Sequence, residues 1–386
     1  MTHDYDCVVI GLGILGSSVA HHLAAAGARV LAVDRFSRSH DLGSSSGDTR
    51  IVQHLVFGGS AYTSLLHRAL GAWNELEREA DERLFFPKPA LLVGPENSQL
   101  LSLALRGDSR DSKGLRVLGR PDLRRLHPGV SFTPSDIGVL DESAGLLWAH
   151  RCVETVQRLA KEHGAQLRFG VRAKVDWSRT TRNSARVRLQ NDLASIEAGS
   201  VVIAAGSWVG QLLPRTLRRI FSVERIVQYW FEDDGFEDSE ARPNHAQLTT
   251  LMLDRTNELH AVVPSLKQPH LHKVMSARGQ SVFEQAEVER TVSISEQESI
   301  RRWHSRNFPD HPRTLKRFAV CTYTTTADDH FVIDHVPATS VVLASACCGR
   351  GFKVAPVLGR TIASMITTGR SPAELEPFRL QRPGLS

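Results

Sequence analysis

The feature that most constrains the fold is a glycine pattern joining a buried strand to a helix. Residues 6–11 (DCVVIG) are a short apolar run ending at glycine, which is typical of a buried parallel strand. Residues 11–16 (GLGILG) then show the spacing G-x-G-x-x-G. Residues 13–27 carry one apolar helical face and stop at glycine, and residues 29–34 are a second buried strand. The chain therefore opens with a strand–helix–strand unit.

This unit has the sequence of a dinucleotide-binding site. Gly11 permits a tight turn, Gly13 lets the backbone approach a pyrophosphate, and Gly16 lets helix and strand pack closely. The N-terminus of the helix adds free N–H groups and a positive dipole end, which favour an anion. Asp34 ends the second strand, where its carboxylate can bind ribose hydroxyls and repel the extra phosphate of NADP. FAD and NAD share this fingerprint, so the pattern leaves both open.

Two later segments favour FAD over NAD. Residues 201–206 form another apolar strand ending in glycine, followed by Ser207 and Trp208, and residues 348–353 are a glycine-rich segment before the last helix. Flavin oxidases of this layout bring a late loop and a helix N-terminus back to the flavin.

Composition excludes several classes of protein. The net charge is +5, and the basic residues are scattered instead of forming the stripe with aromatic residues that a nucleic-acid-binding protein shows. No apolar stretch is long enough to span a membrane, and the N-terminus lacks the features of a secretory signal. The five cysteines are odd in number and irregularly spaced, which argues against a disulfide framework or a metal site. We expect a cytoplasmic protein without a metal.

A length of 386 residues suits two domains. Buried parallel-type strands occur at the start, near residue 200 and near the end, with alternating strand patterns between them. We predict an α/β (α+β two-domain) fold, in which a mixed-sheet substrate domain is inserted into a Rossmann-like FAD-binding domain. The FAD-binding domain is predicted to comprise residues 1–80, 145–215 and 322–386, and the substrate domain 81–144 and 216–321.

With these segments in place, the chain resembles the monomeric sarcosine oxidase family, which includes N-methyltryptophan oxidase and belongs to the D-amino-acid-oxidase-like FAD-dependent oxidoreductases. The resemblance covers nearly the whole chain and suggests a monomer. Its motifs are GLGILG (11–16), SSGDTRI (45–51), IAAGSWVG (203–210), CTYTTTADDHFVIDH (321–335) and GRGFK (349–353). The fourth motif is the most specific.

The resemblance implies a covalent flavin and three functional cations. Cys321 matches the family cysteine that joins a flavin ring methyl as a thioether, a reaction that needs a thiolate and benefits from a nearby cation. Arg50 matches the loop beside the flavin, and Lys353 matches a lysine that contacts the substrate carboxylate. Lys273 matches the lysine that activates dioxygen, where positive charge stabilises developing superoxide. Without the resemblance, Cys321 reads as a small buried hydrophobe.

The fingerprint and the resemblance together assign the site residues. FAD binding is assigned to Gly11, Gly13, Ile14, Gly16, Asp34, Arg35, Ser45, Thr49, Arg50, Gly206, Trp208, Cys321, Gly349, Gly351, Phe352 and Lys353. Catalysis is assigned to Lys273, Arg50 and Lys353, and substrate binding to Gln53, Arg350 and Lys353. His330 and Asp334 belong to the fourth motif, and we expect them to be structural.

Three positions depart from the family pattern. Gln53 replaces an arginine that forks onto the substrate carboxylate, and a neutral hydrogen bond is about half as strong as the charged pair. Ala277 replaces a histidine near the dioxygen lysine, and Arg350 replaces the histidine of the last motif. We therefore expect intact cofactor binding, a rewritten substrate pocket and a substrate other than free sarcosine. Arg350 is a candidate to take over carboxylate binding.

These observations predict an FAD-dependent oxidase of a secondary or cyclic amine, such as an N-methyl amino acid or a cyclic imino acid. Hydride transfer to the flavin and reoxidation by dioxygen would give an imine and hydrogen peroxide. One alternative is an amine dehydrogenase or desaturase of a specialised biosynthetic pathway, which passes electrons to another acceptor. Another is a flavoprotein that binds a ligand without catalysis. The predicted partners are a small amine and dioxygen, with no nucleic acid or membrane.

Overall fold

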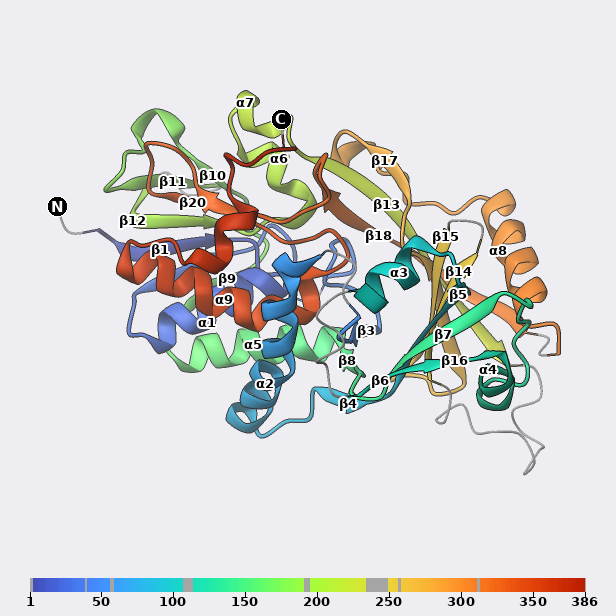
Figure 1. The fold of residues 1–386 in the computed structure, drawn as a ribbon. Coiled ribbons are helices and arrows are strands. Elements are labelled where there is room, and N and C mark those ends of the chain that lie inside the picture. Colours follow the sequence, from blue (N-terminus) through green and yellow to red (C-terminus); the bar gives the residue numbers. More distant parts are fainter. Residues whose placement is uncertain are drawn as a thin grey trace.

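The computed structural model describes residues 3–38, 40–55, 59–106, 114–190, 195–233, 249–255, 258–310 and 313–385. Within these ranges the strands form an eight-stranded, a nine-stranded and a three-stranded sheet. Figure 1 shows the two large sheets at opposite ends of the molecule, with the termini on the side of the eight-stranded sheet.

The eight-stranded sheet is built on the strands of the dinucleotide unit. Its strands are β1 (Tyr5–Ile10), β2 (Val30–Val33), β9 (Gln166–Arg168), β10 (Ala173–Val175), β11 (Ala185–Leu189), β12 (Ser195–Ile203), β19 (Val332–His335) and β20 (Val341–Ser345). β1 lies between β2 and β12 and is parallel to both, and β12 is parallel to β20. Strands from the start, middle and end of the chain thus share one sheet, as predicted. Residues 167–175 alternate apolar and polar residues, a period that predicts antiparallel strands, but β9 is parallel to β2, which corrects this prediction.

Helices cover one face of this sheet, as Figure 1 shows. They are α1 (Ile14–Ala25), α2 (Thr63–Ala80), α5 (Ala149–Glu162) and α9 (Gly351–Thr368). Cys7 and Val9 of β1 pack into a core with α1 and α9, whereas Val8 and Ile10 pack into a second core with β10 and β11. This alternation follows from the two-residue period of a strand. The short helices α6 (Val209–Leu212) and α7 (Arg215–Arg218) lie beside the second core.

The nine-stranded sheet is mixed, as predicted for the inserted part. Its strands are β5 (Ala90–Pro95), β6 (Leu115–Leu118), β7 (Asp136–Asp141), β13 (Ser222–Asp233), β14 (Thr250–Arg255), β15 (Glu258–Pro264), β16 (Leu271–Ser276), β17 (Gln280–Val282) and β18 (Arg313–Thr325). β14 is parallel to β5, and the other pairs are antiparallel. The helices around it are α3 (Gln99–Arg106), α4 (Arg120–Leu126) and α8 (Ile294–Asn307).

The three-stranded sheet was not predicted. It consists of β3 (Thr49–Val52), β4 (Phe85–Pro87) and β8 (Gly145–Trp148), with β8 in the middle. The sequence predicts a loop over 35–60, which is polar and rich in serine and glycine, and a turn at Gly145, because neither short segment shows a strand pattern by itself. Similarly, the sequence predicts a helix over 98–127 with a break near Gly107, whereas β6 lies within this region and the break lies outside the described residues.

The sheets follow the predicted segments of the chain. All strands of the eight-stranded sheet come from the segments predicted to bind FAD, and those of the nine-stranded sheet come from the other segments, apart from the last residues of β18. The division into two domains remains a prediction. Among the described residues, every helix is too short or too polar to cross a bilayer.

Candidate active site

A cavity of about 1300 Å³ lies between the two large sheets. One end is formed by the loop between β1 and α1 with the end of β2, and the other by β14, β15 and β16. Small-molecule sites usually measure roughly 300–1,000 Å³, so this volume has room for a dinucleotide cofactor and a small substrate together.

The end beside β1 has the shape and the hydrogen-bonding groups of a dinucleotide site. Gly11 has φ +103°, and an added Cβ would lie 2.4 Å from the carbonyl oxygen of Ala204, so the turn requires glycine. Gly13, the N-cap of α1, makes no side-chain capping bond, and the backbone N–H of Ile14 in the first turn donates to Oγ of Ser45 at 3.0 Å. The N-terminus of α1 and the Ser45 hydroxyl thus lie together where a pyrophosphate would bind. Asp34 accepts hydrogen bonds from the backbone N–H groups of Leu12 (2.8 Å) and Phe36 (2.9 Å), which fix its carboxylate at the cavity wall. These residues fit the pyrophosphate and ribose of FAD.

Three cations from three elements line the opposite end. Arg50 comes from β3, Lys273 from β16 and Lys353 from the first turn of α9. The Arg50 guanidinium donates to the carbonyl oxygens of Thr49 (3.0 Å), Ser44 (2.8 Å) and Ser46. All these acceptors are neutral, so they fix the position of the guanidinium without cancelling its charge.

Lys273 is the most deeply buried of the three, with 1% of its surface exposed. Its Nζ donates to the carbonyl oxygen of Thr49 at 2.8 Å. Burial, followed by the nearby charge of Arg50, lowers the pKa of Lys273 to about 7.

Lys353 is fixed through its backbone carbonyl, whereas its ammonium group has no partner among the described residues. The indole N–H of Trp73 donates to the Lys353 carbonyl oxygen at 2.8 Å. Within the described ranges, no side chain or backbone group forms a hydrogen bond or an ion pair with the ammonium group. Burial, followed by the charge of Arg350, lowers the pKa of Lys353 to about 8. A partly buried cation without a partner at a cavity wall is a binding group for an anion.

Gln53 and Arg350 line the same cavity but differ in their partners. Gln53 is 3% exposed, and its Oε1 lacks a hydrogen-bond partner among the described residues. Arg350 donates to the Asp329 carboxylate at 3.1 Å and lies over the ring of Tyr62 at 5.0 Å. Asp329 therefore competes with a substrate carboxylate for Arg350, which weakens the expectation that Arg350 replaces the missing family arginine.

Most of the predicted site residues line the cavity. They are Gly11, Gly13, Ile14, Asp34, Arg35, Ser45, Thr49, Arg50, Gln53, Gly206, Trp208, Lys273, Gly349, Arg350, Gly351, Phe352 and Lys353. Gly16 and Cys321 are not among the lining residues. At Gly16 an added Cβ would lie 1.9 Å from the carbonyl oxygen of Gly11, which agrees with its expected packing role. His330 and Asp334 also lie outside the lining, where they bond to Tyr62 and to the backbone of Leu380.

Cys321 lies in β18 with 2% of its surface exposed. The amide of Gln228 donates to its Sγ at 3.2 Å. Burial raises the pKa of the Cys321 thiol, while the positive charges of Arg50 and Lys273 act in the opposite direction. Cys347 does line the cavity, and its thiol lies 2.6 Å from Oγ of Ser44.

Sequence reasoning missed the residues of the far wall. They include Met252 in β14, Ala261 and Val263 in β15, Met275 in β16 and Tyr323 in β18. The two-residue period of β16, which places Met275 on the same face as Lys273, was the available signal. Tyr323 lies within the fourth motif but was not singled out.

Comparison with known proteins decides the family. A family model described as FAD dependent oxidoreductase matches residues 6–365. The chain belongs to this family. FAD is therefore the cofactor of this family, which decides against NAD.

Individual relatives confirm the resemblance seen in the sequence. This oxidoreductase is 33% identical to monomeric sarcosine oxidase from Streptomyces avermitilis, over 99% of its own length and 98% of the relative. It is 28% identical to N-methyl-L-tryptophan oxidase from Yersinia pestis, over 98% of its own length and 99% of the relative. The solved structure of NikD, an unusual amino acid oxidase essential for nikkomycin biosynthesis, superposes with a TM-score of 0.83 at 19% identity and covers 98% of each chain. That structure supports the fold.

Proposed function

We propose that this FAD-dependent enzyme oxidises the CH–NH bond of a secondary or cyclic amine that carries a carboxylate. The substrate class is an N-methyl amino acid or a cyclic imino acid, giving an imine and hydrogen peroxide. One observation supports a substrate with a carboxylate. Lys353 lines the cavity, and its ammonium group has no partner among the described residues. A carboxylate on the substrate would supply that partner.

The residues of the chain orient the substrate and supply charge. FAD, when bound, accepts a hydride from the carbon next to nitrogen and passes the electrons on to dioxygen. Lys353 pairs with the substrate carboxylate, and the buried amide of Gln53, which lines the same cavity, offers a neutral hydrogen bond. Lys273 and Arg50 place positive charge at the same end of the cavity, where it stabilises negative charge that develops during electron transfer.

The charge of Lys273 favours dioxygen as the acceptor over a protein or another small molecule. A buried cation stabilises the anionic products of dioxygen reduction more strongly than an exposed one, because the interior screens charge less than water does. We include in the proposal a covalent bond from Cys321 to the flavin, a monomeric state and a cytoplasmic location. All five cysteines are unpaired, which suits a reducing compartment.

The decisive experiment compares flavin reduction with peroxide release in the purified holoenzyme. A panel of N-methyl and cyclic amino acids, each with its decarboxylated analogue, is added without air and the flavin absorbance is followed. The same amines are then tested under air for hydrogen peroxide. We expect the carboxylated amines to bleach the flavin faster than their analogues and to release peroxide.

The other outcomes separate the alternatives. Bleaching without peroxide release under air would identify a dehydrogenase or desaturase. Faster bleaching by the decarboxylated analogues would contradict the role of Lys353. If no amine reduces the flavin, the remaining alternative is a flavoprotein that binds a ligand without catalysis.

A further inference from the structure

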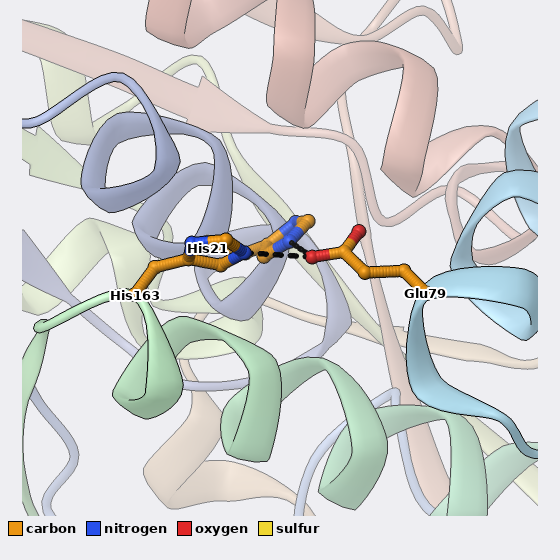
Figure 2. Close-up of side chains that lie close together, drawn as sticks. All are labelled: His21, Glu79 and His163. Atoms are coloured by element: carbon orange, nitrogen blue, oxygen red, sulfur yellow. Dashed lines mark hydrogen bonds and ion pairs between the residues drawn. The ribbon is translucent and has the colours of Figure 1, made fainter.

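Three helices bring two histidines and a glutamate together at a point outside the FAD cavity. His21 lies in α1, Glu79 in the last turn of α2, and His163 directly after α5. Figure 2 shows both imidazole rings directed at the same carboxylate oxygen. Nε2 of His21 lies 2.9 Å from Oε1 of Glu79, and Nε2 of His163 lies 2.7 Å from that atom. None of the three lines the cavity.

The convergence of three groups distinguishes this cluster from ordinary histidine–carboxylate contacts. His270 contacts Glu232 at 3.7 Å without a third metal-ligating side chain, and Glu232 also pairs with Lys316. The ligand atoms of His21, Glu79 and His163 all lie within 4.8 Å of one another, and no other such group of three is found in the part of the chain that the structure describes. Two imidazole nitrogens and one carboxylate oxygen are a common ligand set for Zn²⁺, with a water in the fourth position.

Holding an ion requires both the carboxylate and the imidazole rings to move. Zinc–nitrogen and zinc–oxygen bonds of about 2.0–2.1 Å in a tetrahedral site place neighbouring ligand atoms roughly 3.3 Å apart. The Glu79 oxygen would have to withdraw by about half an ångström from each imidazole, and the two imidazole nitrogens, which lie within 4.8 Å of each other, would have to approach to about the same 3.3 Å. The side chains of Glu79 and His163, which are 37% and 40% exposed, have room for these movements. His21, 3% exposed, is the fixed ligand, while His163, 40% exposed, leaves a route from solvent.

The helix ends also favour a cation at this point. Glu79 is close to the C-terminus of α2, and His163 is the C-cap of α5. The partial negative charge of the helix dipole is concentrated at these ends, so a divalent cation there is favoured by two helices at once.

We propose that His21, Glu79 and His163 bind a divalent transition-metal ion, Zn²⁺ in the first place, which ties α1, α2 and α5 together. The site is independent of the proposed amine oxidation. The ion would bind α1 at His21, away from the glycine loop that precedes this helix. We therefore expect the ion to make the folded protein more stable and to leave the rate of amine oxidation unchanged. The sequence suggested no metal site because the three ligands come from distant segments with no shared motif.

The test uses the chelator-treated holoenzyme without a histidine tag. Calorimetric titration with ZnCl₂ is expected to show one ion bound per chain, and MgCl₂ none, because imidazole ligands select transition metals. Saturating Zn²⁺ should raise the melting temperature by a few degrees. Glu79→Gln keeps a hydrogen-bond acceptor for both histidines, and His163→Ala changes an exposed residue, so both should fold.

Removing a group that only hydrogen-bonds to a metal ligand lowers metal affinity roughly 10- to 100-fold. Each of these variants removes a ligand itself, so its affinity for Zn²⁺ should fall by at least that factor. The matched control is His270→Ala, which removes a histidine with 41% side-chain exposure beside a glutamate and should bind Zn²⁺ like wild type. The FAD content and melting temperature of each metal-free variant report its folding.

Two results would overturn the proposal. One is a wild-type protein that binds no Zn²⁺ in the calorimeter. The other is unchanged binding in both Glu79→Gln and His163→Ala, which would place the ion elsewhere. Anomalous scattering from zinc-soaked crystals gives an independent location and should show a peak between His21, Glu79 and His163.

Discussion

The Cys321 thiol is buried outside the cavity lining, yet two cations act on it. Arg50 and Lys273 lower the cost of forming the thiolate that attachment to flavin needs. We therefore predict that acid-precipitated wild-type protein forms a yellow pellet and that Cys321→Ala leaves the colour in the supernatant. Cys347→Ala, which removes the thiol that does line the cavity, should keep the yellow pellet. A colourless pellet from Cys347→Ala together with a yellow one from Cys321→Ala would assign the bond to Cys347.

A substitution of Gln53 tests the proposed recognition of a substrate carboxylate. An arginine there could form a bidentate ion pair, which is about twice as strong as a neutral hydrogen bond. We predict that Gln53→Arg lowers the KM for a carboxylated amine by about tenfold, corresponding to about 1.4 kcal/mol. Steady-state kinetics with the decarboxylated analogue is the control, since its KM should not fall. Equal changes for both substrates would mean that residue 53 does not contact the carboxylate.

A substitution of Lys273 tests whether dioxygen is the electron acceptor of the reduced flavin. We predict that Lys273→Met slows reoxidation of the reduced enzyme by dioxygen about 10²- to 10³-fold, the usual effect of removing one preorganised electrostatic contact. Anaerobic reduction by the amine should change much less. Stopped-flow absorbance measures both half-reactions, and Lys267→Met, a change at an exposed lysine, is the control. Unchanged reoxidation in Lys273→Met would favour the dehydrogenase alternative.

At the scale of elements, the N-terminus of α9 places Phe352 and Lys353 in the cavity wall. A Cβ added at Gly351 would lie 1.5 Å from the carbonyl oxygen of Ala346, so the first turn packs against the end of β20. We predict that Gly351→Ala displaces this turn and lowers both FAD content and turnover. Gly71→Ala in α2 is the control, because nothing lies within 4 Å of its added Cβ. Alanine there should stabilise the helix by up to about 1 kcal/mol. Normal FAD content in Gly351→Ala would show that the turn adapts.

The elements that the sequence predicted are those with a local signal. β1, α1 and β2 follow from apolar runs and glycine spacing, and α9 follows from its apolar face. β3 and β8 carry no such signal, because each becomes a strand through pairing with the other, as between Arg50 and Leu147. Strand propensity in such short segments depends on the tertiary neighbour.

The same limit applies to the site. The glycine loop and Asp34 could be placed from the sequence, because their geometry is local. Lys273 meets the backbone of Thr49 only because β16 of one sheet faces β3 of another, and the resemblance to a family, not the spacing, suggested it. The cluster of His21, Glu79 and His163 was missed for the same reason.

At the scale of the whole molecule, histidines that the fold favours in the neutral form lie in both halves. Burial lowers the pKa of His22 in α1 to about 4, and that of His127, which follows α4, also to about 4. The ordinary value is 6.5, so the unfolded chain takes up these protons first as the pH falls. Their contribution to stability is complete above about pH 6.5 and is lost progressively as the pH falls to about 4. Because one histidine packs with each large sheet, we expect both halves to become acid-labile over the same window.

The contribution of a single histidine to this pH dependence of stability can be measured at His127. It is 4% exposed, and its Nε2 lies within hydrogen-bonding distance of Oγ1 of Thr249. A shift from 6.5 to about 4 corresponds to about 3 kcal/mol that the folded protein loses on acidification. His127→Gln removes the titrating group but keeps a polar side chain, so its free energy of unfolding should fall less between pH 7 and pH 4.5 than that of wild type. Urea unfolding at several pH values measures this slope, with His270→Gln as the exposed control. Parallel slopes for His127→Gln and wild type would mean that His127 is not held neutral by the fold.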